Sequence, residues 1–211
     1  MPTILTFGDS NTHGTTPMPS RDHNARFGFG TRWPTVMAEH LGPDWHVVED
    51  GLPGRTTQHD DPAMWPNMNG QTGLRMALAS HQPLDVVAIM LGTNDLKTRF
   101  APSVEKITAG AAGLLDIALT DDLQARHGPF RVLLICPPPV VETGPIRGEF
   151  TGAGAIAPNL TRAYADLAHA RGAAFLDAGT VISVSDTDGV HFDAPAHRTL
   201  GEAVAEAVRS L

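Results

Sequence analysis

Cysteine is nearly absent from this sequence, because Cys136 is the only one among 211 residues. A single cysteine excludes an internal disulfide bond and a metal site built from several thiolates. Since Cys136 ends an apolar run, we expect a small buried side chain rather than a nucleophile. The histidines outside the motifs described below show no metal-ligand spacing, and at His59-Asp60-Asp61 a solvated turn is favoured over a cation site. We therefore expect no metal and no other cofactor.

Long apolar segments and basic segments are also missing. No apolar stretch approaches the ~18 residues of a membrane-spanning helix, and no basic and then apolar leader comes before the first predicted strand. The 15 Lys and Arg residues and 23 Asp and Glu residues give a formal net charge of −8, with no basic run. These absences argue against nucleic acid and against a membrane as partners. We expect a cytoplasmic protein.

Short apolar runs alternate with helical patterns along the chain. The apolar runs predict strands at 4–7, 45–49, 84–91, 131–136 and 174–177. The helical patterns predict helices at 33–41, 74–81, 104–123, 160–171 and 196–211. This alternation is typical of an α/β fold, a parallel sheet with helices on both faces. We predict a three-layer α/β/α sandwich of about five strands and a single domain over residues 1–211.

The first strand leads directly into Gly8-Asp9-Ser10-Asn11-Thr12-His13-Gly14. A glycine-containing turn after a buried strand lifts a side chain to the carboxyl edge of the sheet, where open α/β folds bind ligands. On its own, this stretch favours an ordinary turn or a helix cap over a nucleophile. A phosphate site is a weaker alternative, because neither Gly-x-x-x-x-Gly-Lys nor Gly-x-Gly-x-x-Gly occurs. A role for Ser10 as nucleophile requires a base and oxyanion donors elsewhere in the chain.

Suitable groups follow the other predicted strands. His191 can take a proton near neutral pH, and Asp188, three residues earlier, can fix the tautomer of its imidazole. Gly54 offers an unobstructed N–H and Asn94 a neutral amide, which are the donors that an oxyanion needs. Each group alone is an ordinary turn or cap residue. Their occurrence in order at successive strand ends predicts a serine hydrolase site at one edge of the sheet.

These residues resemble the four sequence blocks of the SGNH (GDSL-type) hydrolases. The resemblance covers nearly the whole chain and rests on Gly8-Asp9-Ser10, Gly54, Gly92-Thr93-Asn94-Asp95 and Asp188-Gly189-Val190-His191. The bacterial arylesterase and acyltransferase branch is especially similar, through Gly51-Leu52-Pro53-Gly54-Arg55-Thr56-Thr57, Ile89-Met90-Leu91-Gly92-Thr93-Asn94-Asp95 and Asp177-Ala178-Gly179. The Gly-x-Ser-x-Gly elbow is absent, so the chain does not resemble an α/β-hydrolase.

The resemblance implies a flavodoxin-like sheet with strand order 2-1-3-4-5. It also implies an acyl-serine intermediate and an oxyanion hole formed by the N–H groups of Ser10 and Gly54 and the side chain of Asn94. We expect Asp9, Asn11, His13 and Thr93, the neighbours of Ser10 and Asn94 in these motifs, to bind substrate.

Two positions leave alternatives. His13 stands where the arylesterase branch usually has tryptophan, so a more polar pocket wall is expected, which counts against the aromatic-ester and acyl-transfer preferences of that branch. His13 is also a rival base close to Ser10, but it has no evident carboxylate to orient it. Asp186 is a rival to Asp188 as the partner of His191.

We interpret the chain as a serine esterase that acts on small acyl esters. Related alternatives are an O-acetyl esterase for carbohydrates, a thioesterase, and an acyltransferase or perhydrolase; an alternative of another class is a non-catalytic ligand-binding module. The sequence lacks a long apolar lid helix, so we expect acetyl-sized acyl groups to be preferred. The competing interpretation is an apolar tunnel lined by Met64, Trp65 and Met68.

The loops at 58–71 and 137–157 carry more apolar side chains than solvated loops need. Together with the family resemblance, they predict a homo-oligomer with a restricted pocket that binds a small-molecule ester. The residues concerned are Met64, Trp65, Met68, Val140, Val141, Ile146 and Phe150.

Overall fold

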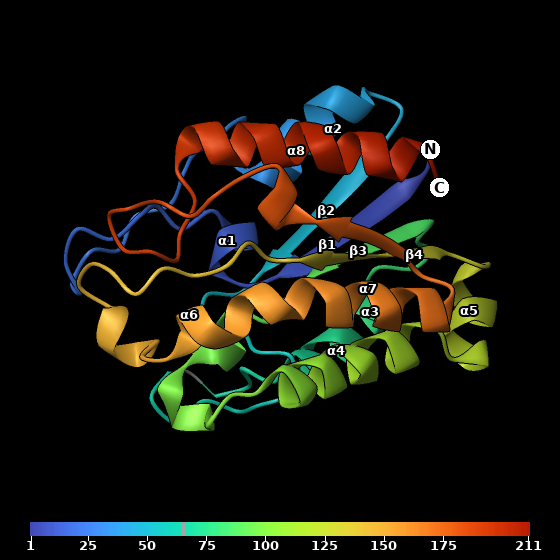
Figure 1. Cartoon of the computed structure of the whole chain (residues 1–211). Helices are drawn as coiled ribbons and strands as arrows, with labels where there is room; N and C mark the ends of the chain where they lie inside the picture. The colour runs from blue at the N-terminus through green and yellow to red at the C-terminus, as the bar shows by residue number, and fades with distance from the viewer. Residues whose placement is uncertain (65) are drawn as a thin grey trace.

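The computed structural model describes residues 1–64 and 66–211. Its five-stranded sheet is parallel throughout and has the order β2-β1-β3-β4-β5. The strands are β1 (Thr3–Gly8), β2 (His46–Gly51), β3 (Val86–Met90), β4 (Arg131–Cys136) and β5 (Ala174–Asp177). With helices on both faces of the sheet, this order confirms the predicted three-layer α/β/α sandwich and the predicted strand order (Figure 1).

The helices divide between the two faces of the sheet (Figure 1). The helices α2 and α8 cover one face, and α3, α4 and α7 cover the other. The bounds are α1 (Ser10–His13), α2 (Trp33–Leu41), α3 (Gly70–Ser80), α4 (Val104–Ala118), α5 (Asp121–His127), α6 (Ala153–Ile156), α7 (Leu160–Arg171) and α8 (Ala194–Arg209). Short 3-10 turns occur at Asn94–Leu96, Thr98–Phe100, Arg147–Glu149, Ala157–Asn159 and Ala178–Thr180.

Side chains along the strands point alternately to the two faces of the sheet, and each face has its own apolar core. In β1, Ile4 packs with α2 and α8, whereas Leu5 and Phe7 pack with α3 and α4. All five residues of β3 are buried, because this central strand is covered on both faces. The apolar run that predicted β3 is therefore continuous rather than alternating.

Three predicted helices differ from the observed ones. The helix predicted at 196–211 is α8, which begins at Ala194 after the cap residue Asp193 and ends at Arg209. The helix predicted at 74–81 begins at Gly70, because the side chain of Asn69 accepts hydrogen bonds from Gln71 N and Thr72 N and caps the helix. The helix predicted at 104–123 is two helices, α4 and α5. The chain leaves the helical conformation at Thr120 (φ −63°, ψ 140°), and α5 begins with two acidic residues, which suit a helix N-terminus.

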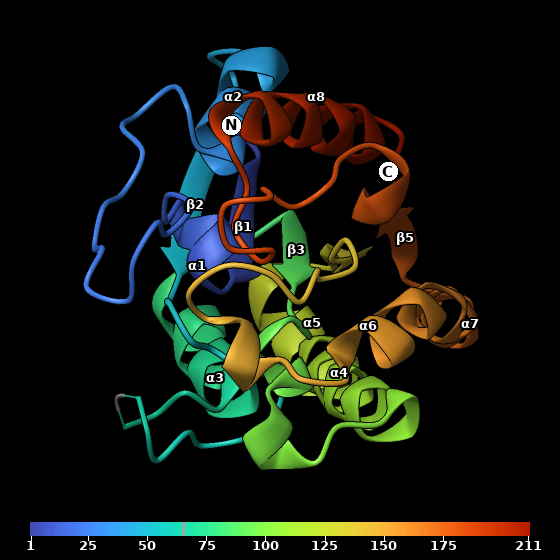
Figure 2. The same ribbon diagram turned by 60° about the vertical axis from the view of Figure 1, so that its left-hand side comes forward.

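The register of the sheet brings the ends of three strands together. Gly8, the last residue of β1, pairs with Gly51 of β2 and Met90 of β3. The segments that follow these three residues therefore start side by side at the carboxyl edge. Figure 2 shows the long connections gathered around α1 at this edge, and Figure 1 shows both chain termini at the opposite side of the molecule.

None of the helices in the described residues is both long enough and apolar enough to span a membrane.

Candidate active site

Ser10 is the first residue of α1, directly after β1. Asp9 caps this short helix, because its Oδ1 accepts a hydrogen bond from Asn11 N at 2.9 Å. The cap turns the chain sharply at the sheet edge and leaves Ser10 Oγ facing the pocket described below. Ser10 is 6% exposed, so its hydroxyl meets solvent only through that pocket.

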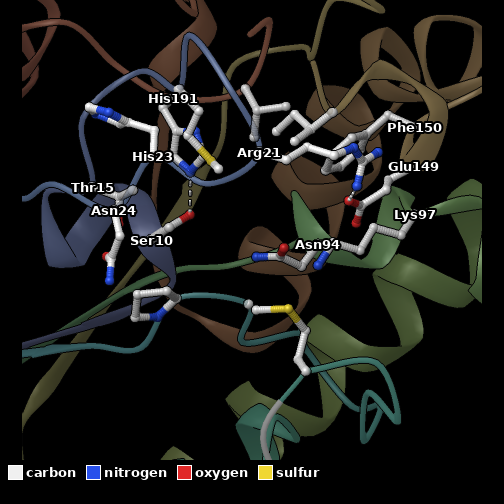
Figure 3. Close-up of a pocket in the computed structure, with 16 residues that line it drawn as sticks. Ser10, Thr15, Arg21, His23, Asn24, Asn94, Lys97, Glu149, Phe150 and His191 are labelled. Atoms are coloured by element: carbon white, nitrogen blue, oxygen red, sulfur yellow. Dashed lines mark hydrogen bonds and ion pairs between the residues drawn. The ribbon is translucent and has the colours of Figure 1, made fainter. Parts of the chain in front are cut away.

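His191 lies next to Ser10 although 181 positions separate them in sequence. His191 Nε2 is 3.1 Å from Ser10 Oγ, and His191 Nδ1 is 2.7 Å from Asp188 Oδ2 (Figure 3). Asp188 Oδ1 accepts hydrogen bonds from the main-chain N–H groups of Val190 and His191, and Oδ2 accepts one from Met18 N at 2.7 Å. Serine, imidazole and carboxylate are therefore within hydrogen-bond distance in a continuous line.

The surroundings of Asp188 keep it ionised. Burial alone would raise its pKa, but the hydrogen bond and charge of His191 and the main-chain donors outweigh this effect and lower the pKa from 3.8 to about 2. An ionised carboxylate beside Nδ1 favours the tautomer with the proton on Nδ1. His191 Nε2 then carries the lone pair that faces Ser10 Oγ.

Gly189 allows the tight turn between Asp188 and His191. Its φ is +72°, and a Cβ at this position would collide with the main-chain oxygen of Val141. A main-chain hydrogen bond joins the two segments at this point, from Val141 N to Gly189 O at 2.8 Å. The turn that carries His191 is thus fixed against the segment that follows β4.

Asn11 holds the main chain on both sides of His191. Its Nδ2 donates to Val190 O at 3.1 Å, and its Oδ1 accepts from Phe192 N at 3.2 Å. Asn11 is 1% exposed and both ends of its amide are used in this way. The residue after Ser10 therefore couples the position of the serine to that of the imidazole.

Gly54 lies in the loop after β2, with φ at +90°. This conformation favours glycine, and a Cβ would also lie 2.7 Å from Met64 Cε, the end of a flexible side chain that would have to move. The next residue, Arg55, anchors the loop. Its guanidinium donates to Gly8 O, Asp50 O and Asp50 Oδ1, and lies 4.0 Å above the ring of Phe7.

Asn94 follows β3 and presents its amide nitrogen toward Ser10 (Figure 3). Asn94 Nδ2 donates to Arg55 O at 3.1 Å and lies 3.4 Å from Asp9 Oδ2. Asp9 is 2% exposed, and this burial raises its pKa from 3.8 to about 6, against the lowering by Asn11 N–H and by the charges of His191 and Lys97.

Asp95 joins the loop after β2 to the segment after β3. Its carboxylate accepts hydrogen bonds from Thr57 N at 2.9 Å and from Thr57 Oγ1 at 2.5 Å. Gly54 and Asn94 are therefore held in one bonded unit rather than on two independent loops.

Ser10, Gly54, Asn94 and His191 line one pocket of about 390 Å³. Its volume is within the range of small-molecule sites. The loop at 15–30 lies over the site and supplies five lining residues. The complete lining is Ser10, Thr15, Met18, Arg21, His23, Asn24, Pro53, Gly54, Met64, Asn94, Lys97, Ile146, Glu149, Phe150, Val190 and His191.

The structure separates the rival residues. His13 Nδ1 is 3.3 Å from Thr15 Oγ1, whereas the imidazole next to Ser10 Oγ is that of His191. Asp186 is exposed, whereas Asp188 is fully buried against His191. The four residues predicted to bind substrate, Asp9, Asn11, His13 and Thr93, do not line the pocket. Contact of these four with substrate stays a prediction.

Sequence reasoning missed most of the pocket wall. No role was predicted for the residues of the loop at 15–30 that line the pocket, among them Met18, Arg21, His23 and Asn24. Lys97 was not considered either. The one available signal for Lys97 was its place three residues after Asn94. No group of three or more His, Cys, Asp or Glu side chains suited to a metal ion occurs in the part of the chain that the structure describes.

Comparison with known proteins identifies the family. Residues 6–199, more than half of the chain, match the model of the GDSL-like Lipase/Acylhydrolase family. The chain belongs to this family. It is a carboxylic ester hydrolase.

Solved structures of this family resemble the whole chain. The native aryl esterase of M. smegmatis is 40% identical, with a TM-score of 0.95 over 100% of both chains. Est24, a carbohydrate acetylesterase from Sinorhizobium meliloti, is 37% identical, with a TM-score of 0.94 over 100% of this chain and 99% of Est24. Another carbohydrate acetylesterase family member from Sinorhizobium meliloti is 33% identical, with a TM-score of 0.89 over 100% and 98% of the two chains. A comparison with curated protein sequences found no match.

Proposed function

We propose that this GDSL-family hydrolase cleaves short-chain acyl esters through an acyl-serine intermediate. In this proposal Ser10 is the nucleophile, His191 the general base and acid, and Asp188 the group that orients His191. The observation that carries the proposal is the line of contacts from Ser10 Oγ to His191 Nε2 at 3.1 Å and from His191 Nδ1 to Asp188 Oδ2 at 2.7 Å. Serine needs such a base because its free hydroxyl is a weak nucleophile.

In the first half of the reaction, His191 Nε2 takes the proton of Ser10 while Oγ bonds to the ester carbonyl carbon. The electron pair of the carbonyl moves to its oxygen, and the resulting oxyanion is stabilised by three donors: the N–H of Ser10, the N–H of Gly54 and the side chain of Asn94. The bond to the alcohol oxygen then breaks, and the alcohol leaves with the proton from His191.

In the second half, water replaces the alcohol. His191 removes a proton from this water as its oxygen bonds to the acyl carbon, and the same donors stabilise the second oxyanion. The bond to Ser10 Oγ breaks, Oγ regains a proton from His191, and the carboxylic acid leaves. Throughout both halves, the Asp188 carboxylate stabilises the imidazolium without taking up its proton.

A second candidate within this chemistry is hydrolysis of O-acetyl esters of carbohydrates. Two similar solved structures are described as carbohydrate acetylesterases. The pocket also favours a polar alcohol, because Thr15, His23 and Asn24 line it together with charged side chains. The candidates differ in the alcohol and use the same serine, so one assay with sugar acetates and simple acetates compares them.

The test of the proposed function is release of p-nitrophenol from p-nitrophenyl acetate. Ser10→Ala is expected to lower kcat/KM by more than about 10³-fold, because the covalent route is lost. The matched control is Ser210→Ala, at the exposed serine that caps the C-terminal end of α8. Its kcat/KM is expected to equal that of the wild type. Activity of Ser10→Ala within tenfold of the wild type would refute the assignment of the nucleophile.

A further inference from the structure

Five charged side chains are joined by ion pairs at one side of the pocket, and we call them the charged wall. Arg21, Lys97 and Glu149 line the pocket and lie near Phe150 (Figure 3), whereas Asp61 and Arg99 contact them without lining it. Arg99 bonds to Asp61 at 2.9 Å and to Glu149 at 2.6 Å, and Arg21 bonds to Glu149 at 3.1 Å. The members are Arg21, Asp61, Lys97, Arg99 and Glu149. Three cations share two carboxylates, so the wall carries one excess positive charge in a chain whose formal net charge is −8.

Lys97 is the member of the charged wall with unused hydrogen-bonding capacity. Its side chain is 6% exposed, and among the described residues its one ion-pair partner is Asp61 Oδ2, at 3.5 Å. Asp61 is already occupied, since it accepts hydrogen bonds from Ala63 N and from Arg99. An ammonium group has three donors, and a buried cation is costly unless those donors find acceptors. Among the described residues no side chain or main-chain oxygen accepts a short hydrogen bond from Lys97 Nζ, so its N–H groups are available to a ligand in the pocket that it lines.

The pKa of Lys97 lies below its ordinary 10.5, and two neighbouring carboxylates limit this shift. Burial lowers the pKa of Lys97, while the carboxylates of Asp61 and Glu149 act in the opposite direction. Burial would raise the pKa of Asp61, but the N–H of Ala63 and the charges of Arg99 and Lys97 bring it below 3.8. An ionised Asp61 at 3.5 Å offsets part of the charge of Lys97 and leaves part for a ligand.

Lys97 is held in a fixed position relative to the reacting groups. It follows the 3-10 turn Asn94–Leu96, and its N–H donates to Asn94 O at 3.2 Å. Lys97 lies on the same side of the pocket as Asn94, Glu149 and Phe150, opposite Thr15 and Asn24 (Figure 3). An ester bound with its carbonyl oxygen near Asn94 would therefore place one of the two groups on its carbonyl carbon on the Lys97 side of the pocket.

We infer that Lys97 forms a subsite for a carboxylate carried by the alcohol portion of the ester. The inference rests on the proposed function, because it takes the ester to be bound at Ser10. An acetyl-sized acyl group fills only a small part of about 390 Å³, so most of the pocket is available to the alcohol. A carboxylate matches the excess positive charge of the wall and accepts hydrogen bonds from an ammonium group better than a neutral oxygen does.

The test compares acetate esters whose alcohol differs only in charge. The probes are 3- and 4-acetoxybenzoate and the corresponding methyl esters, and the readout is the ratio of kcat/KM for the carboxylate over its methyl ester. In Lys97→Met this ratio is expected to fall by about ten- to a hundredfold for at least one isomer, the range for a hydrogen bond to a charged group. The ratio cancels both the intrinsic reactivity of the esters and any general loss of activity in the variant.

Lys106→Met is the matched control, because Lys106 is exposed and bonds to Ala101 O in the same region of the chain. This variant is expected to keep the wild-type ratio. An unchanged ratio in Lys97→Met for both isomers would overturn the inference. If the methyl esters are still hydrolysed in a Ser10-dependent manner, that outcome leaves the proposed function intact, so the two failures are distinguishable.

A second measurement needs no variant. The wild-type enzyme is assayed with p-nitrophenyl acetate in the presence of 3- or 4-hydroxybenzoate or their methyl esters. The carboxylates are expected to be competitive inhibitors with inhibition constants about tenfold or more below those of the methyl esters. Equal inhibition by both members of each pair would also overturn the inference, whether or not Lys97→Met folds.

Discussion

Single side chains behind the pocket hold Ser10, His191 and Asn94 in place. Asn11 bonds to the main chain on both sides of His191, and Asp9 caps the helix that begins with Ser10 while lying 3.4 Å from Asn94 Nδ2. Both residues are almost completely buried. A buried polar side chain is stable only where its hydrogen bonds are made, so these contacts fix the spacing of serine, imidazole and amide.

Asn94→Ala tests the proposed oxyanion donor. We expect the variant to fold and to lose about 10²–10³-fold in kcat, the usual loss when one such donor is removed. The measurement is steady-state hydrolysis of p-nitrophenyl acetate, with Asn159→Ala at an exposed position of another segment as the control. A kcat of Asn94→Ala within a few-fold of the wild type would mean that Asn94 serves only the 3-10 turn that it begins.

Asp9→Asn is expected to raise the free energy of unfolding at pH 7 and to lower kcat. Burial holds the pKa of Asp9 at about 6, above its ordinary 3.8, so folding favours the protonated form. The contribution of Asp9 to stability is therefore present below pH 3.8 and is lost as the pH rises through about 6. At pH 7 the ionised side chain costs about 3 kcal/mol, which the neutral amide avoids, while its oxygen can still accept the N–H of Asn11.

Urea unfolding at pH 4 and pH 7 measures this effect. The gain in free energy of unfolding for Asp9→Asn is expected to be large at pH 7 and small at pH 4. We also expect kcat to fall, because an amide nitrogen in place of Asp9 Oδ2 cannot accept a hydrogen bond from Asn94. The same change in stability at both pH values would disprove the role of the buried charge.

At the scale of elements, two long connections narrow the pocket. The segment 58–69 contributes Met64, and the segment 137–152 contributes Ile146, Glu149 and Phe150. Met68 is 1% exposed and does not line the pocket. Trp65, the remaining residue of the alternative apolar tunnel, lies outside the described residues. The pocket wall is therefore a mixture of apolar and charged side chains rather than a continuous apolar groove.

Acyl chain length tests this description of the loops. We expect kcat/KM to fall from p-nitrophenyl acetate through butyrate to octanoate, because longer chains must compete with the packed side chains of both segments. An open groove would instead gain ~0.8 kcal/mol for each methylene that it buries. Values that rise through octanoate would reveal such a groove and contradict the preference for acetyl-sized groups.

The sequence predicted elements best where local signals mark their ends. The helix at 33–41 ends before Gly42 and the helix at 160–171 before Gly172, and both agree with the structure in every residue. The break at Thr120 was missed because the apolar periodicity continues from α4 into α5. No glycine or proline marks that break, so a pattern-based prediction runs the two helices together.

The sequence predicted the residues at the strand ends of the candidate site but not the charged wall. Ser10, Gly54 and Asn94 follow three neighbouring strands, and the parallel topology brings them to one pocket. His191 lies further along the segment after the edge strand β5, and the contacts of Asn11 with Val190 and Phe192 complete its placement. The charged wall was not predictable, because its members meet only through the paths of long loops. Arg21 and Glu149, for example, form an ion pair across 128 positions of sequence.

At the scale of the whole molecule, most of the apolar loop residues pack within their own chain. Met68, Val140, Ile146 and Phe150 are buried within the chain itself. Met64 and Val141 remain partly exposed, at 39% and 50%, and so does Phe29, at 83%. Most of the apolar material in the two loops therefore packs against its own subunit, and this weakens the residue-based argument for association.

A homo-oligomer stays a prediction, supported by the family resemblance and by the exposed Met64 and Val141. Multi-angle light scattering at micromolar concentration is expected to give a multiple of the 22.4 kDa chain mass. Val141→Asp is then expected to shift the distribution toward the single chain, because it places a charge on the exposed apolar surface. A particle of 22.4 kDa for the wild-type protein would contradict association.

The most direct test of the account is covalent labelling with a fluorophosphonate probe, followed by mass spectrometry of the digested protein. A serine activated by His191 attacks the phosphorus and displaces fluoride, whereas ordinary serines do not react. We predict a single adduct on the peptide that contains Ser10, and no adduct in Ser10→Ala. An adduct on another residue, or full labelling of Ser10→Ala, would contradict Ser10 as the nucleophile.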